Sequence, residues 1–207
     1  MSNTICLAFT GASGMQYGVR LLECLLEAGC RVQLLYWQAA QIVVRQEMAL
    51  MLPSRASDAQ VFFRERYAAL RGSLDVFGRD EWFSPVASGS NPPDAMVVCL
   101  CTMGKLASIA QGVAKNLIER AVDVVIKIKE GRKLVLVPRE TPFSVIHLEN
   151  MLRLVHVGAV ILPPAPGFYH HLQRIEGSVA FVVARILDQL RLLYSLMPRW
   201  GVEEVVS

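Results

Sequence analysis

The chain is 207 residues long, which is room for one α/β domain, since a domain usually takes about 100 to 200 residues. Apolar residues make up 53% of it and charged residues 19%, so the composition excludes an intrinsically disordered protein. The net charge of +3 is too small to indicate nucleic-acid binding. Its positive excess gathers between residues 100 and 140, which favours a small phosphorylated ligand.

The first half of the chain predicts alternating strands and helices. Residues 4–9 form a predicted buried strand, and a glycine-containing turn leads from it into a helix that ends near Gly29. Residues 31–36 are predicted to form the second strand. Helices are expected over residues 38–47 and 59–70.

The second half continues the alternation after a loop at residues 83–93. Strands are predicted over residues 95–100, 133–137 and 159–162, and helices over residues 105–127, from Ser144 onward, and over 175–193. This order predicts a doubly wound parallel sheet in a three-layer α/β sandwich, as one domain covering residues 1–207. The tail from about residue 195, which includes Trp200, is expected to contact other subunits.

Signals for a membrane or for export are not found in the sequence. No stretch approaches the roughly 18 to 20 consecutive apolar residues that a spanning helix needs. Residues 1–9 lack the basic segment of a signal peptide. The five cysteines are odd in number and irregularly spaced, which indicates free thiols and predicts a cytoplasmic protein.

The turn at residues 10–14 predicts a platform for a phosphate or a cofactor. Gly11 and Gly14 let the backbone turn sharply and approach a ligand, Ser13 offers a hydroxyl, and the following helix offers free amides. The turn matches neither the dinucleotide fingerprint nor the P-loop. A tight connection that holds no ligand is therefore an equally weighted alternative.

Arg139 and Glu140 follow the predicted strand at residues 133–137 and lie between Pro138 and Pro142. They are expected at the carboxyl edge of the sheet, where open α/β sheets bind ligands. Arg139 can hold an anion with two hydrogen bonds, and Glu140 can move a proton. An exposed ion pair in a loop is the alternative, weighted about equally.

Three other groups of residues are candidates either for binding a ligand or for a purely structural role. Tyr169 reaches the same edge and can donate to a phosphate, whereas His170 and His171 point apart and make a poor metal pair, so no metal site is predicted. Cys99 and Cys101 are expected on one face of a strand as buried structural thiols. Residues 116, 120 and 127 are predicted to share one helix face, either as a solvated basic stripe or facing a phosphate.

Several segments, taken in order, resemble the UbiX-type flavin prenyltransferases over nearly the whole chain. Any one of these motifs is modest, but the ordered set is highly specific. They are Thr10–Gly14, Gln16–Gly18, Ala87–Ser90, Asn116–Ala121, Leu136–Ser144, Ile146–Met151, Pro166–His170 and Pro198–Gly201.

The resemblance implies a flavodoxin-like Rossmann subunit that assembles into a dodecamer and binds reduced FMN at the subunit interface. It implies a metal-independent prenyltransferase that joins a dimethylallyl group from dimethylallyl phosphate to FMN. The prenylated FMN would serve a partner UbiD-type decarboxylase, in a setting such as ubiquinone biosynthesis. The sequence leaves open whether the donor is a mono- or a diphosphate.

The resemblance also carries over site residues. The flavin site would consist of Gly11, Ala12, Ser13, Trp37, Thr102, Met103, Gly104, Lys105 and Arg139. The substrate phosphate would be held by Arg120, Lys127, Arg139, Tyr169 and Arg185, with Lys129 in place of Lys127 if the alignment carries a gap. Catalysis would fall to Ser13, Glu47 and Glu140.

Three positions depart from the family pattern on the flavin side. Trp37 and Lys105 stand where the family has small hydroxyl residues, and Leu100 stands where a proline is usual. Lys105 would either supply a charge to the FMN phosphate or obstruct it. These departures raise a second hypothesis, a non-catalytic paralogue in which Trp37 blocks the flavin pocket and the chain binds another ligand or serves assembly. The intact prenyl-phosphate side, with Arg139, Tyr169 and Arg185, keeps the enzyme ahead of it.

Overall fold

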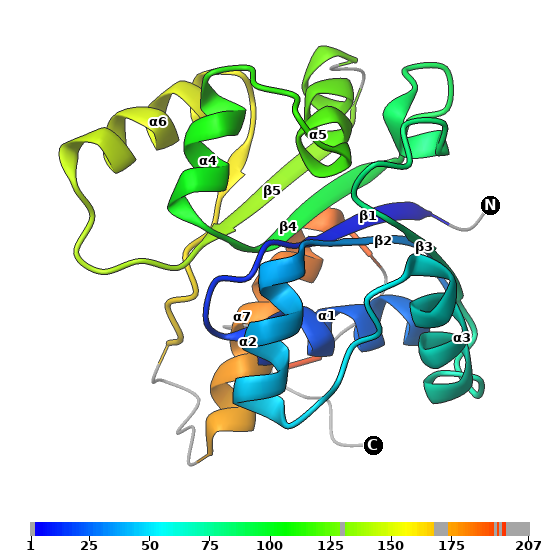
Figure 1. Ribbon diagram of the computed structural model, residues 1–207. Helices are drawn as coiled ribbons and strands as arrows, with labels where there is room; N and C mark the ends of the chain where they lie inside the picture. The colour runs from blue at the N-terminus through cyan, green and yellow to red at the C-terminus, as the bar shows by residue number, and fades with distance from the viewer. Residues whose placement is uncertain (1–2, 129–130, 168–173, 193, 195, 198–207) are drawn as a thin grey trace.

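The computed structural model describes residues 3–128, 131–167, 174–192, 194 and 196–197 (Figure 1). Its centre is a parallel sheet of six strands in the order β3-β2-β1-β4-β5-β6. The strands are β1 (Thr4–Phe9), β2 (Arg31–Tyr36), β3 (Ser73–Phe77), β4 (Ala95–Cys101), β5 (Lys133–Pro138) and β6 (Val160–Ile161). The predicted doubly wound parallel sheet is confirmed.

Helices cover both faces of this sheet, which gives the three-layer sandwich (Figure 1). One layer contains α1 (Met15–Glu27), α2 (Gln38–Met48), α3 (Ala56–Arg66) and α7 (Ile175–Leu190). The other contains α4 (Met103–Ala110), α5 (Leu117–Lys127), α6 (Val145–His156) and the short 3₁₀ turn η1 (Pro85–Ala87). Because both faces are covered, the central strands are continuous apolar runs, and every residue of β4 is buried.

The strand order places a topological switch point between β1 and β4. From β1 the chain builds outward through β2 and β3, and then returns to β4 on the other side of β1. The loops that leave the carboxyl ends of β1 and β4 therefore diverge to opposite faces of the sheet. Such a crevice is where open α/β sheets bind ligands.

Three sequence-based expectations about the elements were wrong. The single helix predicted over residues 105–127 is two helices, because Gly112 adopts a positive φ of 69° and Asn116 caps a new helix. The helix predicted over residues 59–70 spans Ala56–Arg66 instead, and the edge strand β3 that follows it was not predicted. Burial of β3 alternates along its length, as in a half-covered edge strand.

Cys99 and Cys101 do not share one face of β4, contrary to the prediction. The register of β4 against β5 shifts between them, so Leu100 is an extra residue in the alternation. Cys99 packs with the α1 and α7 layer, and Cys101 packs with the α4 and α5 layer. Burial raises the pKa of both thiols, as expected for structural cysteines.

Within the described part of the chain, none of the helices combines the length and the apolar character that a membrane crossing requires.

Candidate functional site at the carboxyl edge of the sheet

The turn between β1 and α1 lies directly against the first turn of α2. Gly11 has a φ of 92°, and a Cβ built on it would stand 2.6 Å from the carbonyl carbon of Ala39. Gly14 has a φ of 102° and is the N-cap of α1. Both positions require glycine, because an L side chain would be strained and would collide with its neighbours. The turn and the start of α2 therefore form one continuous wall of the crevice.

The amides at the N-terminus of α1 are not free, contrary to the expectation from the sequence. The carboxylate of Glu47, on the last turn of α2, accepts hydrogen bonds from the amides of Gly14 at 2.9 Å and Met15 at 2.9 Å. It takes the place of a capping side chain, which Gly14 cannot supply. A carboxylate is well placed there, since a helix N-terminus carries partial positive charge.

The pKa of Glu47 lies below its ordinary value. Burial alone would raise this pKa, but hydrogen bonds from the Ser13 side chain and the two helix amides lower it, as does the charge of Arg139. Glu47 is therefore ionised at neutral pH.

Arg139 completes a cluster with Ser13 and Glu47. Its Nε donates to the carbonyl oxygen of Ser13 at 3.3 Å, and its side chain is exposed at the carboxyl end of β5. Glu140, the next residue, is also exposed and accepts a hydrogen bond from the amide of Thr141 at 3.1 Å. Segments 126 residues apart in the chain thus supply a cation and carboxylates to one place at the sheet edge.

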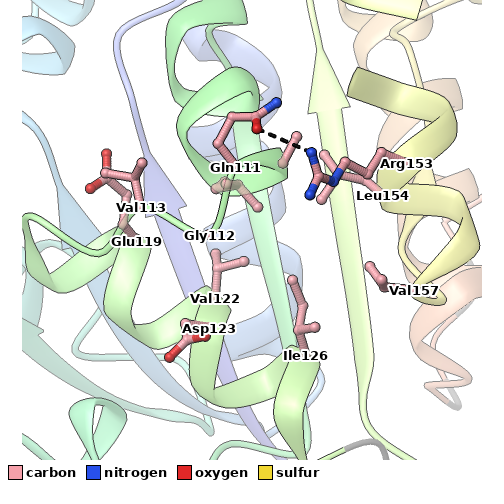
Figure 2. A pocket seen from close by; sticks show the side chains of 12 residues that line it. Gln111, Gly112, Val113, Glu119, Val122, Asp123, Ile126, Arg153, Leu154 and Val157 are labelled. Carbon is pink, nitrogen blue, oxygen red and sulfur yellow. Dashed lines mark hydrogen bonds between the residues drawn. The ribbon is translucent and has the colours of Figure 1, made fainter. Parts of the chain in front are cut away.

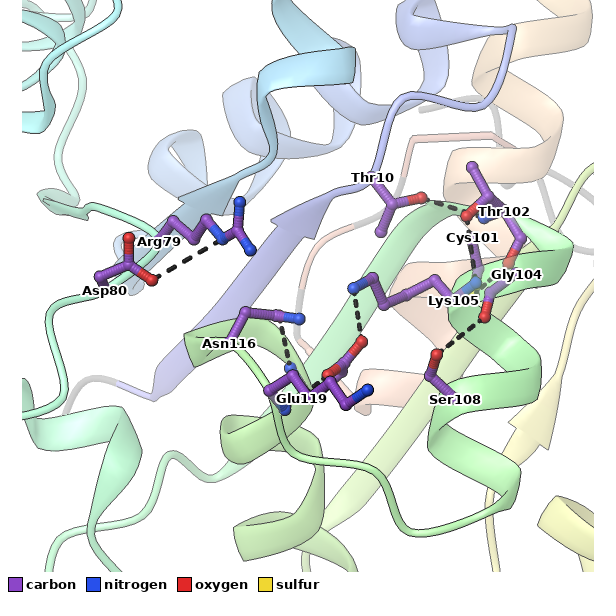
Figure 3. Close-up of polar contacts among 11 residues, drawn as sticks. Thr10, Arg79, Asp80, Cys101, Thr102, Gly104, Lys105, Ser108, Asn116 and Glu119 are labelled. Carbon is purple, nitrogen blue, oxygen red and sulfur yellow. Dashed lines mark hydrogen bonds and ion pairs between the residues drawn. The ribbon is translucent and has the colours of Figure 1, made fainter.

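The start of α4 is fastened to the end of β1 through two threonines. Thr10 Oγ1 donates to the carbonyl of Leu100 at 2.6 Å and accepts from the amide of Thr102 at 3.0 Å. Thr102 in turn caps α4, accepting from the amide of Lys105 at 3.3 Å. These contacts fix the predicted flavin residues at positions 102–105 beside the turn at residues 10–14 (Figure 3).

Lys105 and Trp37 contact each other, and both belong to one polar cluster. The ammonium of Lys105 lies 4.3 Å from the centroid of the Trp37 ring and 2.7 Å from Glu119 Oε1. The side chains of Lys105 and Glu119 are only 10% and 4% exposed, so this ion pair is largely removed from water. The guanidinium of Arg79 also lies over the Trp37 ring, 4.4 Å from its centroid.

Glu119 is held in its ionised form by this arrangement. Burial alone would raise its pKa, but Lys105, the amide of Lys115 and the capping residue Asn116 together bring the pKa below its ordinary value. Both charges of the pair are thus satisfied inside the protein. The ammonium of Lys105 is already paired with Glu119, so it is not a free charge for the FMN phosphate.

The predicted basic stripe on one helix is not a stripe of free cations. Asn116 is buried as the N-cap of α5, where it accepts from the amide of Glu119. Arg120 and Lys127 both pair with Asp123, at 2.9 Å and 3.4 Å, and Arg120 Nε donates to the carbonyl of Ala87. Within one chain, only Arg120 and Lys127 therefore share a partly solvated face, and Asn116 has a structural role as the cap of α5.

The expected phosphate residues lie in separate places in a single chain. Arg120 is on α5 and Arg185 is on α7, which cover opposite faces of the sheet. Arg185 pairs with Asp188 at 3.2 Å and lies over the Phe181 ring. Tyr169 and Lys129 lie outside the described residues, as does Trp200. Among the described residues no group of His, Cys, Asp or Glu is arranged to hold a metal ion.

A further cavity contains none of the predicted site residues in its lining, although Glu119 and Asp123, which pair with some of them, do line it. It measures about 250 Å³ and lies among the ends of α4 and α6 and the middle of α5 (Figure 2). Its walls are largely apolar, and at its rim Arg153 Nη1 donates to Gln111 Oε1 at 3.1 Å. The carboxyl edge remains the place where charged and hydroxyl side chains converge.

Comparison with known proteins shows the family to which the chain belongs. The sequence model of the family named Flavoprotein matches residues 1–187. The flavin prenyltransferase UbiX of Pseudomonas aeruginosa is 53% identical over 203 residues, which cover 98% of this chain and 96% of that protein. The chain belongs to the UbiX-type flavin prenyltransferase family. UbiX of Methanocaldococcus jannaschii is 40% identical over 95% of this chain and 98% of its own length.

Solved structures of the family share the fold over the full chain. AnUbiX (PadA1), crystallised in complex with FMN and dimethylallyl pyrophosphate, has a TM-score of 0.85 at 34% identity, covering 99% of this chain and 100% of that one. The dodecameric FMN-dependent UbiX-like decarboxylase from Escherichia coli O157:H7 has a TM-score of 0.82 at 36% identity, covering 96% and 100%. The flavodoxin-like expectation is thereby confirmed.

Arg79 is a residue of this site that the sequence did not single out. It follows β3, an edge strand that was itself not predicted, so its position beside Trp37 had no signal in the sequence. Leu117 donates its backbone amide to the carbonyl of Arg79 at 3.0 Å, which ties the loop after β3 to the start of α5. Arg79 lies at the carboxyl edge because it follows the end of β3 by two residues, and the contact with Leu117 fixes its backbone there.

Proposed function

We propose that this chain is a flavin prenyltransferase, which joins the dimethylallyl group of dimethylallyl phosphate to reduced FMN. The observation that carries the proposal is the full-length likeness to a structure that holds FMN together with dimethylallyl pyrophosphate. Identity of 53% to a UbiX flavin prenyltransferase supports the same reaction. In it, the allylic carbon–oxygen bond breaks, phosphate leaves, and the dimethylallyl carbon bonds to the flavin.

The residues at the carboxyl edge suit FMN. The phosphate of FMN needs a cation, and Arg79 beside Trp37 offers one at this edge. The flat ring needs apolar walls, and Trp37 and Met103 are partly buried beside the same core cluster. When bound, reduced FMN supplies the electron-rich acceptor of the dimethylallyl group.

The Ser13–Glu47–Arg139 cluster is suited to the polar part of the reaction. Arg139 would hold the phosphate as its negative charge develops, which stabilises the departing group. Glu140, exposed next to Arg139, would carry a proton between the reacting groups and solvent. Glu47 stays ionised and keeps Ser13 and the α1 amides in place, so it would act at the flavin by orienting these donors.

The complete site would form between subunits of a homo-oligomer. Within one chain, the phosphate residues Arg120 and Arg185 lie on opposite faces of the sheet, so a neighbouring copy would supply the missing cations. A dodecameric relative supports this assembly. The prenylated FMN would pass to a UbiD-type decarboxylase in the cytoplasm, where the five buried free thiols would stay reduced.

The experiment that tests this function combines a spectrum with a reaction. Freshly purified protein, or protein mixed with FMN, should show flavin absorption, and reduced FMN with dimethylallyl phosphate should give prenylated FMN. If the protein neither binds flavin nor forms the product, the proposal is contradicted. The non-catalytic paralogue is not favoured by the comparisons; it would require that Trp37→Ser create FMN binding that the parent lacks.

A further inference from the structure

Arg79 differs from Lys105, the other cation over the Trp37 ring, because its charge is available to bind a further anion. The closest ion pair that the structure gives it, from its Nε to Asp80 Oδ1, is 3.7 Å long, and its side chain is 56% exposed. Lys105, by contrast, is paired at 2.7 Å with a buried carboxylate. Of the two cations over the indole ring, only Arg79 can therefore take a further anion without leaving another charge unpaired.

The Trp37 ring holds this guanidinium in place. Arginine stacks on aromatic faces through its planar guanidinium, and the stack leaves the edge donors free for a second partner. In Figure 3 the side chains of Arg79 and Lys105 extend toward one another from β3 and from α4. Glu119 neutralises Lys105, which removes much of the repulsion that two like charges on one ring would otherwise produce.

A cavity of about 290 Å³ opens beside this stack. Trp37 and Arg79 line it together with Gln38, Gln41 and Ser54, so its walls combine one cation with polar side chains. Trp37 is the N-cap of α2, and its indole makes no capping hydrogen bond, so the helix presents a partial positive charge to the same place. The charge, the donors and the space all suit a phosphate monoester.

The cavity adjoins the proposed flavin turn. Gly11 packs on Ala39, which lies in the first turn of α2 between the lining residues Gln38 and Gln41. The amide of Trp37, which also lines the cavity, donates to the carbonyl of Phe9 at the end of β1 at 2.9 Å. A ligand along the turn at residues 10–14 would thus extend past Trp37 toward the side on which Arg79 lies.

We infer that Arg79, stacked on Trp37, is a specificity-determining residue that binds the phosphate end of the flavin and so selects FMN over riboflavin. The inference rests on the proposed function. According to this inference, the Trp37 ring positions the phosphate-binding guanidinium of Arg79. The buried Lys105–Glu119 pair in turn holds the Trp37 ring in place. Two of the three departures from the family pattern, Trp37 and Lys105, then act together, because their side chains are in contact.

The test compares the affinity for oxidised FMN with that for riboflavin, which lacks only the phosphate. By titration calorimetry, Arg79→Gln should lower the affinity for FMN about tenfold to a hundredfold and leave that for riboflavin unchanged, as expected for one charged hydrogen bond. Arg64→Gln is the matched control, since Arg64 is 63% exposed on α3 and its ion pair to Asp75 is also 3.7 Å long. It should change neither affinity.

Three outcomes would overturn the inference, and only one of them also contradicts the proposed function. A parent protein that binds FMN tightly while Arg79→Gln binds it equally well removes Arg79 and leaves the proposed function standing. A parent that binds neither flavin contradicts the proposed function and this inference together. An equal loss of both flavins in Arg79→Gln would show a structural effect on the pocket and would also overturn phosphate recognition.

Discussion

At the scale of single residues, the site depends on carboxylates whose surroundings differ. Glu140 is exposed in the loop after β5, where it accepts a hydrogen bond from the adjacent amide of Thr141, so solvent reaches its carboxylate. Glu47 accepts from two helix amides and is held ionised. Two acidic residues near the same arginine are thus suited to different roles, one to moving a proton and one to holding structure.

Replacement of Glu140 tests the first of these roles. Glu140→Gln should slow formation of prenylated FMN about a hundredfold to ten-thousandfold, the usual contribution of a positioned acid–base group. FMN affinity should be unchanged, because the carboxamide keeps the size and polarity of the side chain. Single-turnover kinetics and an FMN titration measure the two effects. Glu149→Gln, on the exposed side of α6, should react at the parent rate, and equal rates in both variants would remove Glu140 from the mechanism.

Replacement of Glu47 tests the second role through the pH dependence of stability. The folded-state pKa of Glu47 is lowered, so its carboxylate stabilises the fold above the ordinary value of 4.5, and this contribution is lost as pH falls through the folded-state pKa. Glu47→Gln should therefore be less stable than the parent by about 1 kcal/mol at neutral pH.

Urea unfolding from pH 7 down to the acid limit measures this difference. The difference in free energy of unfolding between the parent and Glu47→Gln should narrow as the pH drops, because the carboxylate of the parent then becomes neutral, like the carboxamide. A gap that stays constant over the whole range would show that the charge of Glu47 contributes nothing to capping α1.

At the scale of elements, the Lys105–Glu119 pair joins the first turn of α4 to the first turn of α5. Glu119 also accepts from the amide of Lys115, so the same carboxylate ties down the loop between the two helices. The helix that the sequence predicts as continuous is broken here into α4 and α5, and this ion pair fixes the orientation of the two helices relative to each other. The prediction failed because it followed the apolar periodicity across the loop and passed over Gly112 and Asn116, which are residues that commonly end and begin helices.

Loss of Lys105 should destabilise the protein strongly. Lys105→Met leaves Glu119 buried without its partner, which costs about 3 to 5 kcal/mol. Lys127→Met removes an exposed pair to Asp123 and should cost less than about 1 kcal/mol. The double variant Lys105→Met with Glu119→Gln should recover part of the loss, since no charge is then buried. Denaturant unfolding compares them, and equal midpoints for the two lysine variants would contradict a structural role for the pair.

At the scale of the whole molecule, α6 presents an apolar face that the single chain leaves uncovered. Its exposed apolar side chains are Val145, Ile146, Leu148, Leu152 and Val155. Contiguous apolar surface of this kind marks an interaction site, and a homo-oligomer is proposed from the dodecameric relative. The subunit contacts are expected to include this face.

A charge on this face should weaken the assembly. Leu152→Lys would bury an ammonium in the subunit contact and should shift the protein toward smaller species in light scattering at micromolar concentration. Val61→Lys on α3 is a matched control, since Val61 is 55% and Leu152 is 56% exposed, and it should keep the parent's size. An unchanged mass for Leu152→Lys would place the contacts on another face.

The sequence by itself determined the fold class and most of the strands, because a covered parallel sheet requires unbroken apolar runs that are readable along the chain. The bounds predicted for β1 and β2 are those observed, and Ser144 caps α6 as expected. Local patterns also marked Arg139 and Glu140, since both directly follow a buried strand.

Tertiary structure alone decided which side chains meet. Glu47 reaches the α1 amides from the far end of another helix, and Arg79 reaches Trp37 from an unpredicted edge strand. Lys105 finds its carboxylate fourteen residues away across a loop. Such contacts depend on distances in space between segments remote in sequence, and no periodicity or local spacing in the chain encodes those distances.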